Sequence, residues 1–159
     1  MRSAVLLEPG EFRIERRDRP TPEADEVLVA VRDVGICGSD VHYYTHGRIG
    51  EYVVENPLVL GHESAGEVVD AGDDVEGIAA GDRVTMEPGV PCEECDHCRR
   101  GVYNRCPDVR FMATPPVDGA FTEYVAWPAD YVYRLPEDVS TRAGALCEPL
   151  SVETSSGRR

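Results

Sequence analysis

Residues 89–108 have the sequence GVPCEECDHCRRGVYNRCPD and contain four of the six cysteines of this 159-residue chain. Thiolates at such short separations can turn back onto one point and close a tetrahedral zinc site that has no open position. An iron–sulfur cluster or free structural thiols are the alternatives. We interpret residues 89–110 as a lobe held together by a structural zinc ion. The four cysteines form the pattern C-x2-C-x2-C-x7-C and are Cys92, Cys95, Cys98 and Cys106.

The composition argues against several classes of protein. Acidic residues outnumber basic residues 30 to 16, which gives a formal net charge of −14. A surface of this sign repels nucleic acids and anionic membranes, so we expect neither as a partner. The chain has no apolar run of about 18 residues, and its N-terminal sequence lacks the pattern of a secretory signal. We therefore expect a cytoplasmic protein in which the clustered cysteines bind metal and form no disulfides.

Short segments with strand-forming patterns follow one another at close spacing, with turn residues between them. This arrangement predicts an antiparallel barrel or sandwich with little helix. Pro9 and Gly10 predict the turn of a hairpin near the N-terminus, and short helical turns are expected after Ser39 and near residues 95–101. The predicted strands cover residues 4–7, 12–15, 27–31, 63–70, 82–86, 120–127 and 131–135, and we expect the last two to pair with each other.

A second set of metal-binding residue types is scattered along the chain. It comprises Cys37 in GICGSD, His62 and Glu63 in GHE, and Glu148 in CEPLS. All are competent zinc ligands, and a site with mixed ligands can leave a position for substrate or water. Taken singly, such a cysteine is more often a buried small residue, and such a His-Glu pair more often forms a surface hydrogen bond. Spacing alone leaves both interpretations open.

Several longer motifs occur in order along the chain. They are GICGSDVHYY (35–44), GHESAGEVV (61–69), GDRVTMEPGVPC (81–92) with the four-cysteine lobe, ATPPVDGAFTEYV (113–125) and CEPLSV (147–152). Taken together, these motifs resemble the zinc-dependent medium-chain dehydrogenases, and most strongly the sorbitol and xylitol (polyol) dehydrogenases. The resemblance extends from about residue 4 to residue 152 and implies a mainly β, GroES-like, partly open β-barrel with short helices and a zinc-binding lobe.

The resemblance implies that this chain has two zinc sites. Cys37, His62 and Glu63 correspond to the ligands of the catalytic zinc ion. Glu148 corresponds to a carboxylate that binds this metal directly or through its bound water. The four clustered cysteines correspond to the structural zinc site of the family.

Three further residues match family positions that have roles in the reaction. Ser39 resembles the hydroxyl that passes a proton outward, while a turn or helix-capping residue is an equally good interpretation of it. Tyr43 and Phe111 correspond to residues that line the substrate pocket, with packing inside the barrel as the alternative. Asp40 is a weaker candidate for a residue that orients a metal ligand by a hydrogen bond without touching the metal.

The implied reaction is the oxidation of a secondary alcohol of a polyol to a ketose, with hydride transfer to NAD or NADP. The chain contains no G-x-G-x-x-G motif for binding such a nucleotide. We therefore predict a catalytic domain over residues 1–152, a truncated tail over residues 153–159 and no nucleotide-binding domain. On this interpretation the isolated chain binds no NAD(P) and is inactive.

Two other expectations concern partners. A separately encoded Rossmann domain would complete the enzyme, and the complete enzyme would form a homo-oligomer. The alternative to an enzyme is a non-catalytic zinc-binding remnant or interaction module with the same fold.

All sixteen basic residues are arginines. Codon usage combined with ordinary acidity accounts for this composition, and so does adaptation to a high-salt cytoplasm. The second explanation predicts that the melting temperature rises from low to molar KCl, because salt screens the self-repulsion of the acidic surface. A melting temperature that does not change over this range would exclude it.

Overall fold

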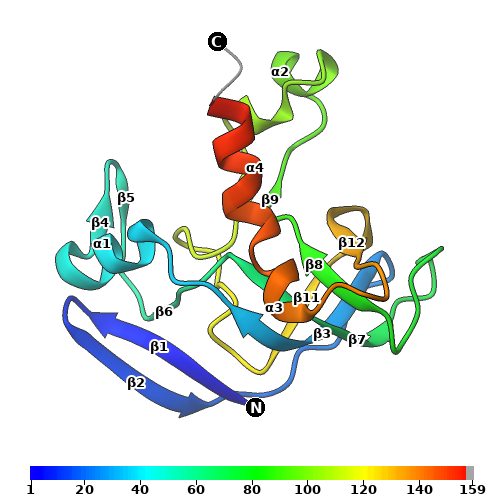
Figure 1. The fold of residues 1–159 in the computed structure, drawn as a ribbon. Coiled ribbons are helices and arrows are strands. Elements are labelled where there is room, and N and C mark those ends of the chain that lie inside the picture. The colour runs from blue at the N-terminus through cyan, green and yellow to red at the C-terminus, as the bar shows by residue number, and fades with distance from the viewer. Residues whose placement is uncertain (157–159) are drawn as a thin grey trace.

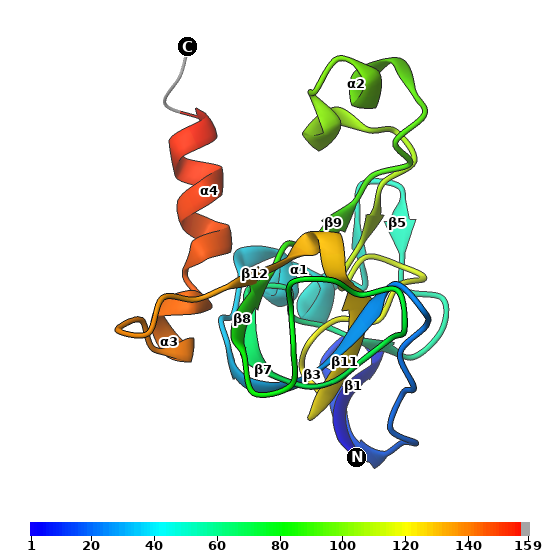
Figure 2. The ribbon, with the colours of Figure 1, turned by 90° about the vertical axis from the view of Figure 1, so that its right-hand side faces the viewer.

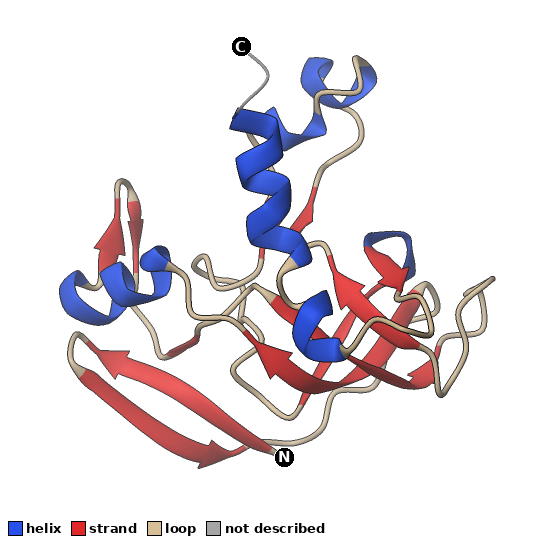
Figure 3. Ribbon diagram, viewed as in Figure 1, coloured by secondary structure: helices blue, strands red, loops and turns tan. Residues whose placement is uncertain are grey.

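The computed structural model describes residues 1–156, which are mainly β with short helices, as predicted (Figures 1 and 3). None of its helices has the length and apolar character that a transmembrane segment needs. The strands are β1 (Arg2–Glu8), β2 (Glu11–Arg16), β3 (Glu26–Val34), β4 (Arg48–Ile49), β5 (Tyr52–Val53), β6 (Leu58–Val59), β7 (Ser64–Ala71), β8 (Arg83–Met86), β9 (Gly89–Val90), β10 (Arg110–Phe111), β11 (Tyr124–Pro128) and β12 (Val132–Arg134). The helices and 3-10 turns are α1 (Gly38–His46), α2 (Asp96–Arg99), η1 (Tyr103–Arg105), η2 (Ala129–Tyr131), α3 (Thr141–Gly144) and α4 (Cys147–Ser156).

The largest sheet is antiparallel and has the strand order β11-β3-β7-β8-β12. Its two longest strands, β3 and β7, pair from Val27 opposite Ala71 to Val34 opposite Ser64. The register between them shifts twice, and such irregularities increase the local twist and bend a strand. The sheet is therefore curved.

A second sheet has the order β2-β1-β6 and includes the predicted N-terminal hairpin of β1 and β2. Several hydrogen bonds connect it to the segment that precedes β11. Ser3 forms a β-bridge with Thr122, and the N–H of Ala4 donates to the carbonyl of Phe121 over 2.8 Å. In residues 1–156 the two sheets are joined in this way without closing into one continuous barrel.

The prediction that the last two strands pair with each other is wrong, because β11 and β12 lie at opposite edges of the largest sheet. The 3-10 turn η2 separates them and carries the chain across the end of the sheet. There the N–H of Ala129 donates to the Asp25 carbonyl over 2.9 Å, and the Tyr131 carbonyl accepts from the N–H of Glu87 over 2.8 Å. Each strand thus pairs with one far away in sequence, β11 with β3 and β12 with β8.

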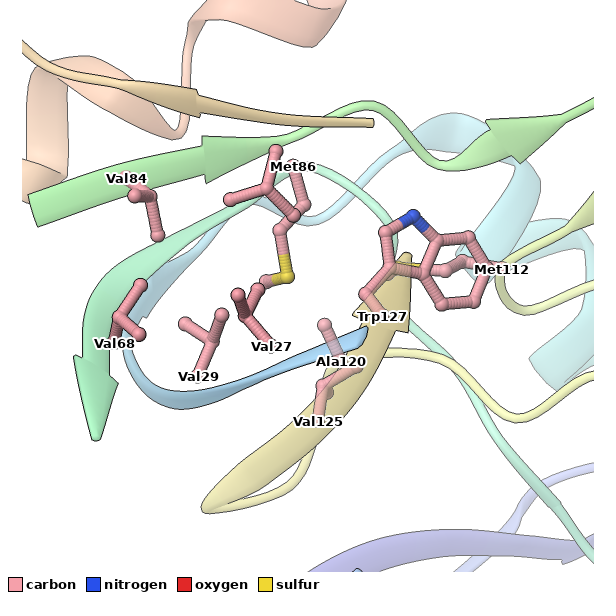
Figure 4. Close-up of a cluster of buried hydrophobic side chains, with 10 residues drawn as sticks. Val27, Val29, Val68, Val84, Met86, Met112, Ala120, Val125 and Trp127 are labelled. Carbon is pink, nitrogen blue, oxygen red and sulfur yellow. The ribbon is translucent and has the colours of Figure 1, made fainter. Parts of the chain in front are cut away.

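All five strands of the largest sheet contribute to one hydrophobic core (Figure 4). Val27 and Val29 point into it from alternate positions of β3, as period-two patterning requires. Trp127 from β11 and Met86 from β8 belong to the same cluster. Because strands from both edges reach the same cluster, the sheet must wrap around it. The buried members are Val27, Val29, Val68, Val84, Met86, Met112, Ala120, Val125, Trp127 and Val132.

A smaller buried cluster holds α1 against the second sheet. Tyr43 from α1 packs with Leu6 of β1, with Leu58 and Leu60, and with Ala113. This packing supports a helix of nine residues, longer than the single turn predicted after Ser39.

The cysteine lobe with α2 and the long helix α4 project from the same side of the sheets (Figures 1 and 2). The helix α4 continues to Ser156, so residues 153–156 of the predicted tail are helical. The rest of that tail, residues 157–159, lies outside the described residues.

Gly66 tests the pairing of β3 with β7. A Cβ atom at this position would overlap the Ala30 carbonyl oxygen and lie 2.7 Å from Cγ1 of Val29. We expect Gly66→Ala to lower the free energy of unfolding by about 3 kcal/mol, because backbone atoms on the partner strand cannot move aside cheaply. Gly38→Ala is the matched control, since a Cβ atom there meets nothing within 4 Å. Equal stability of the two variants in denaturant titration would contradict this account.

Candidate metal centres

The end of β3 and the beginning of β7 bring together three residues that are distant in sequence. Cys37 follows β3, and His62 with Glu63 precedes β7. Since the two strands are antiparallel neighbours, the end of one lies beside the start of the other, and the Gly35 N–H donates to the Glu63 carbonyl over 2.8 Å. The Sγ atom of Cys37, a ring nitrogen of His62 and a carboxylate oxygen of Glu63 all lie within 4.8 Å of one another. We call these three residues the triad.

Asp40 connects the two segments that carry the triad. One carboxylate oxygen accepts from the N–H of Cys37 and the other from the N–H of Gly61, each over 2.9 Å. The same carboxylate lies 3.8 Å from Nδ1 of His62. Asp40 is 3% exposed, so its charge is stabilised by these groups and not by water. It therefore fixes the spacing of the ligand-bearing segments, as a residue behind a metal ligand commonly does.

The chemistry of the triad fits a divalent zinc ion. His62 and Glu63 are 6% and 8% exposed, and in the described part of the chain no hydrogen-bond donor is found for the Glu63 carboxylate. A buried carboxylate without donors is costly unless a cation compensates it. The backbone leaves space for this carboxylate at Gly35, where a Cβ atom would overlap it. Sulfur, nitrogen and oxygen ligands of this kind are typical of zinc sites that keep an open position.

Glu148 lies apart from this set, in the first turn of α4. It is not among the ligand atoms that fall within 4.8 Å of one another. Burial raises its pKa; the charge on His62 opposes the shift, and the charge on Glu63 adds to it. Glu148 is thus close enough to sense the triad electrostatically. Its predicted role as a ligand, direct or through water, stays a prediction.

The four cysteines of the lobe form a second, compact set, with all Sγ atoms within 4.8 Å of one another. The Sγ atoms of Cys95 and Cys98 are 3.4 Å apart, and those of Cys92 and Cys106 are 3.5 Å apart. A tetrahedron with Zn–S bonds of about 2.3 Å has S–S edges of about 3.8 Å. Each of these two pairs is within about 0.5 Å of that edge, so the set needs only a small adjustment to accept zinc.

Protonation of these thiols shows why a cation suits the lobe. The backbone N–H of Cys98 lowers the pKa of Cys95 to about 7. Burial raises the pKa of Cys98 to about 12, and the neighbouring thiols add to that shift. Four thiolates cannot coexist at this distance without a positive charge among them, so metal binding must displace protons.

Phe111, Ser39 and Tyr43, the remaining predicted site residues, lie in different environments. The ring of Phe111 lies 5.7 Å from the ring of His62, centroid to centroid. Ser39 is half-buried in the first turn of α1. Tyr43 is 3% exposed and belongs to the smaller hydrophobic cluster. The functional roles assigned to these three residues stay predictions.

A cleft of about 660 Å³ lies between α4 and the lobe, and its lining includes Phe111, Glu148 and Glu87. Glu87 is not among the site residues predicted from the sequence. The available signal was a carboxylate directly after the buried strand β8, followed by Pro-Gly and then by the first cysteine of the lobe.

The sequence of this chain is similar to one family of domains and to curated proteins that are longer than the chain. Residues 23–137 match the family described as the alcohol dehydrogenase GroES-like domain. Sorbitol dehydrogenase of Bacillus subtilis is 53% identical over 152 residues, which are 96% of this chain and 43% of that protein. D-xylulose reductase A of Aspergillus niger is 50% identical over 146 residues, which are 90% of this chain and 41% of that protein.

Among solved structures, an Escherichia coli oxidoreductase of unknown specificity is similar with a TM-score of 0.90 and 46% identity. The similarity covers 95% of this chain and 44% of that one. The chain thus spans about two fifths of the length of the relatives that it matches.

Two cysteine substitutions should separate the two metal centres. We expect about two zinc ions per chain, one of which is lost in Cys37→Ser with little change in melting temperature. Cys95→Ser should lose the other ion and lower the melting temperature, because a structural zinc ion contributes folding free energy. Metal analysis and thermal unfolding measure both effects. A wild-type chain that binds zinc only at the four cysteines would contradict the assignment of the triad.

Proposed function

The chain belongs to the alcohol dehydrogenase GroES-like domain family, and from that premise we propose that it is the catalytic domain of a zinc-dependent polyol dehydrogenase. The proposed reaction oxidises a secondary alcohol of a sorbitol- or xylitol-type polyol to a ketose, with hydride transfer to NAD or NADP. The observation that carries the proposal is the convergence of Cys37, His62 and Glu63 beside a cleft with room for a polyol. Two relatives whose names refer to sorbitol and xylulose support the substrate class.

The residues of this chain would act on the substrate hydroxyl and its surroundings. A zinc ion held by the triad would supply a Lewis acid that lowers the pKa of a bound hydroxyl group. Asp40 keeps the triad in place through the N–H groups that it accepts from, and the burial of His62 and Glu63 limits access of water. Ser39 would receive the proton from the hydroxyl and pass it outward.

Glu148 has a separate part in the proposal. Burial raises the pKa of Glu148, so its side chain keeps a proton to higher pH than an exposed carboxylate does. It would hold this proton, or a water molecule, beside the metal. Phe111, which contacts His62, would form the apolar wall against which the carbon chain of the polyol lies.

The hydride acceptor requires a part that these 159 residues do not contain, since no G-x-G-x-x-G motif is present. The relatives are more than twice as long as this chain. We propose that turnover depends on a nucleotide-binding domain outside residues 1–159, on the same polypeptide or on another, and that the complete enzyme is a homo-oligomer.

Turnover can be tested by joining the chain to the nucleotide-binding domain of a full-length relative. We expect xylitol-dependent reduction of NAD or NADP, followed by absorbance, which a zinc chelator abolishes. Cys37→Ser should lower kcat/KM by about 1000-fold or more, since loss of the metal removes several kcal/mol of stabilisation.

Cys147→Ser is the matched control for this experiment. Cys147 is exposed and belongs to neither metal set, so activity should be retained. A zinc-loaded fusion that oxidises no alcohol would favour the non-catalytic zinc-binding module. Saturable NAD(P) binding by the unfused chain would show that our account of the nucleotide is wrong.

A further inference from the structure

The cleft between α4 and the lobe contains a carboxylate that the proposed reaction does not use. Its lining includes Glu87 and Glu148 together with Phe111, Tyr103, Asn104 and Ser151. We propose that Glu87 binds a hydroxyl group of the polyol away from the reacting carbon and so selects polyhydroxylated substrates over simple alcohols. This inference rests on the proposed function and assigns Glu87 a role in specificity.

The backbone of Glu87 is fixed on both sides. Its N–H donates to the carbonyl of Tyr131 over 2.8 Å, and its carbonyl accepts from Nε1 of Trp127 over 2.8 Å. The next residue, Pro88, is fully buried. These contacts fix the backbone conformation after β8, so the side chain of Glu87 stays directed toward the cleft that it lines. A group positioned in this way loses little freedom when it binds a ligand.

The carboxylate of Glu87 has unused capacity to accept hydrogen bonds. Its one hydrogen bond in residues 1–156 comes from the N–H of Gly89 to Oε1, at the long distance of 3.4 Å, and no ion pair reaches it. An ionised carboxylate can accept about four hydrogen bonds. Because Glu87 is only half-buried, a ligand in the cleft can reach the free positions.

Gly89 brings this carboxylate close to the wall that leads to the triad. A Cβ atom on Gly89 would lie 3.2 Å from Cδ2 of Phe111 and 3.5 Å from Oε1 of Glu87. The ring of Phe111 in turn contacts the ring of His62. The Glu87 carboxylate and the His62 ring thus lie near the same aromatic ring. On our proposal, an extended polyol would lie along Phe111 with its reacting hydroxyl at the triad and another hydroxyl at Glu87.

The charge in the cleft favours hydroxyl donors over other ligands. Burial raises the pKa of Glu87, and the charge of Glu87 contributes to the raised pKa of Glu148. Two carboxylates repel an anionic substrate, whereas each hydroxyl of a neutral polyol can donate to them. Charge-assisted hydrogen bonds of this kind are stronger than neutral ones. A simple alcohol has no second hydroxyl and gains nothing from Glu87.

Steady-state kinetics of the fused enzyme with two substrates tests the proposal. We expect Glu87→Ala to raise KM for xylitol by about 10- to 100-fold and to change kcat little, because the contact exists before and during reaction. The kcat/KM for propan-2-ol should stay within about twofold. Glu87→Gln should recover part of the loss, since the amide oxygen still accepts a hydrogen bond. Equal losses for both alcohols, or no change for xylitol, would overturn the proposal.

Glu26→Ala is the matched control. Glu26 is half-buried and its carboxylate also accepts one backbone N–H, that of Glu23, over 3.1 Å. It does not line the cleft, so its removal should leave KM for both alcohols unchanged. If Glu26→Ala raised KM for xylitol as much as Glu87→Ala does, the effect would come from a general loss of stability, and the proposal would be overturned.

Binding to the unfused chain gives a second readout that needs no turnover. Titration with xylitol should shift the amide resonance of Gly89, and Glu87→Ala should abolish the shift. If the shift is present but the fused enzyme oxidises nothing, the proposed function fails while the hydroxyl site stands. If xylitol at high concentration leaves Gly89 unchanged, the site itself is disproved.

Discussion

The antiparallel pairing of β3 with β7 is the constraint on which the candidate chemistry depends. Val34 at the end of β3 lies opposite Ser64 at the start of β7, so the segments that leave and enter the two strands are neighbours. A slip by one residue would turn the side chains of β7 to the opposite face of the sheet. Asp40 stabilises this arrangement locally, because its carboxylate accepts one backbone hydrogen bond from each of the two segments.

The two metal sets have different relations to the fold. The four-cysteine set is local, and the lobe around it has almost no hydrophobic core, since neither α2 nor η1 contains a buried residue. Cys106 is its buried cysteine. A segment of this kind gains its order from metal binding. The triad instead depends on a sheet that is already packed, which positions the buried His62 and Glu63 next to the half-buried Cys37.

Local patterns predicted the fold well, and non-local pairing was predicted poorly. The β1–β2 hairpin follows from a turn at Pro9 and Gly10 between two short apolar segments. The partner of β11 could not be inferred in this way. The turn η2 directs the chain away from β11, and β11 pairs with the edge of β3 instead of forming a hairpin with β12. The length of α1 depends on the burial of Tyr43 in a cluster built from distant segments.

The sequence alone predicted the four-cysteine pattern of the lobe, most of the strands and, through ordered motifs, the three residues of the triad. The tertiary structure decided which of these side chains meet. It brings Cys37 to His62 and Glu63 and leaves Glu148 outside the set of ligand atoms that lie within 4.8 Å of one another. It also places Glu87 close to Phe111, because Gly89 has no Cβ atom between them. The physical reason is that spacing along the chain restricts only residues a few positions apart, whereas strand register and packing position the distant ones.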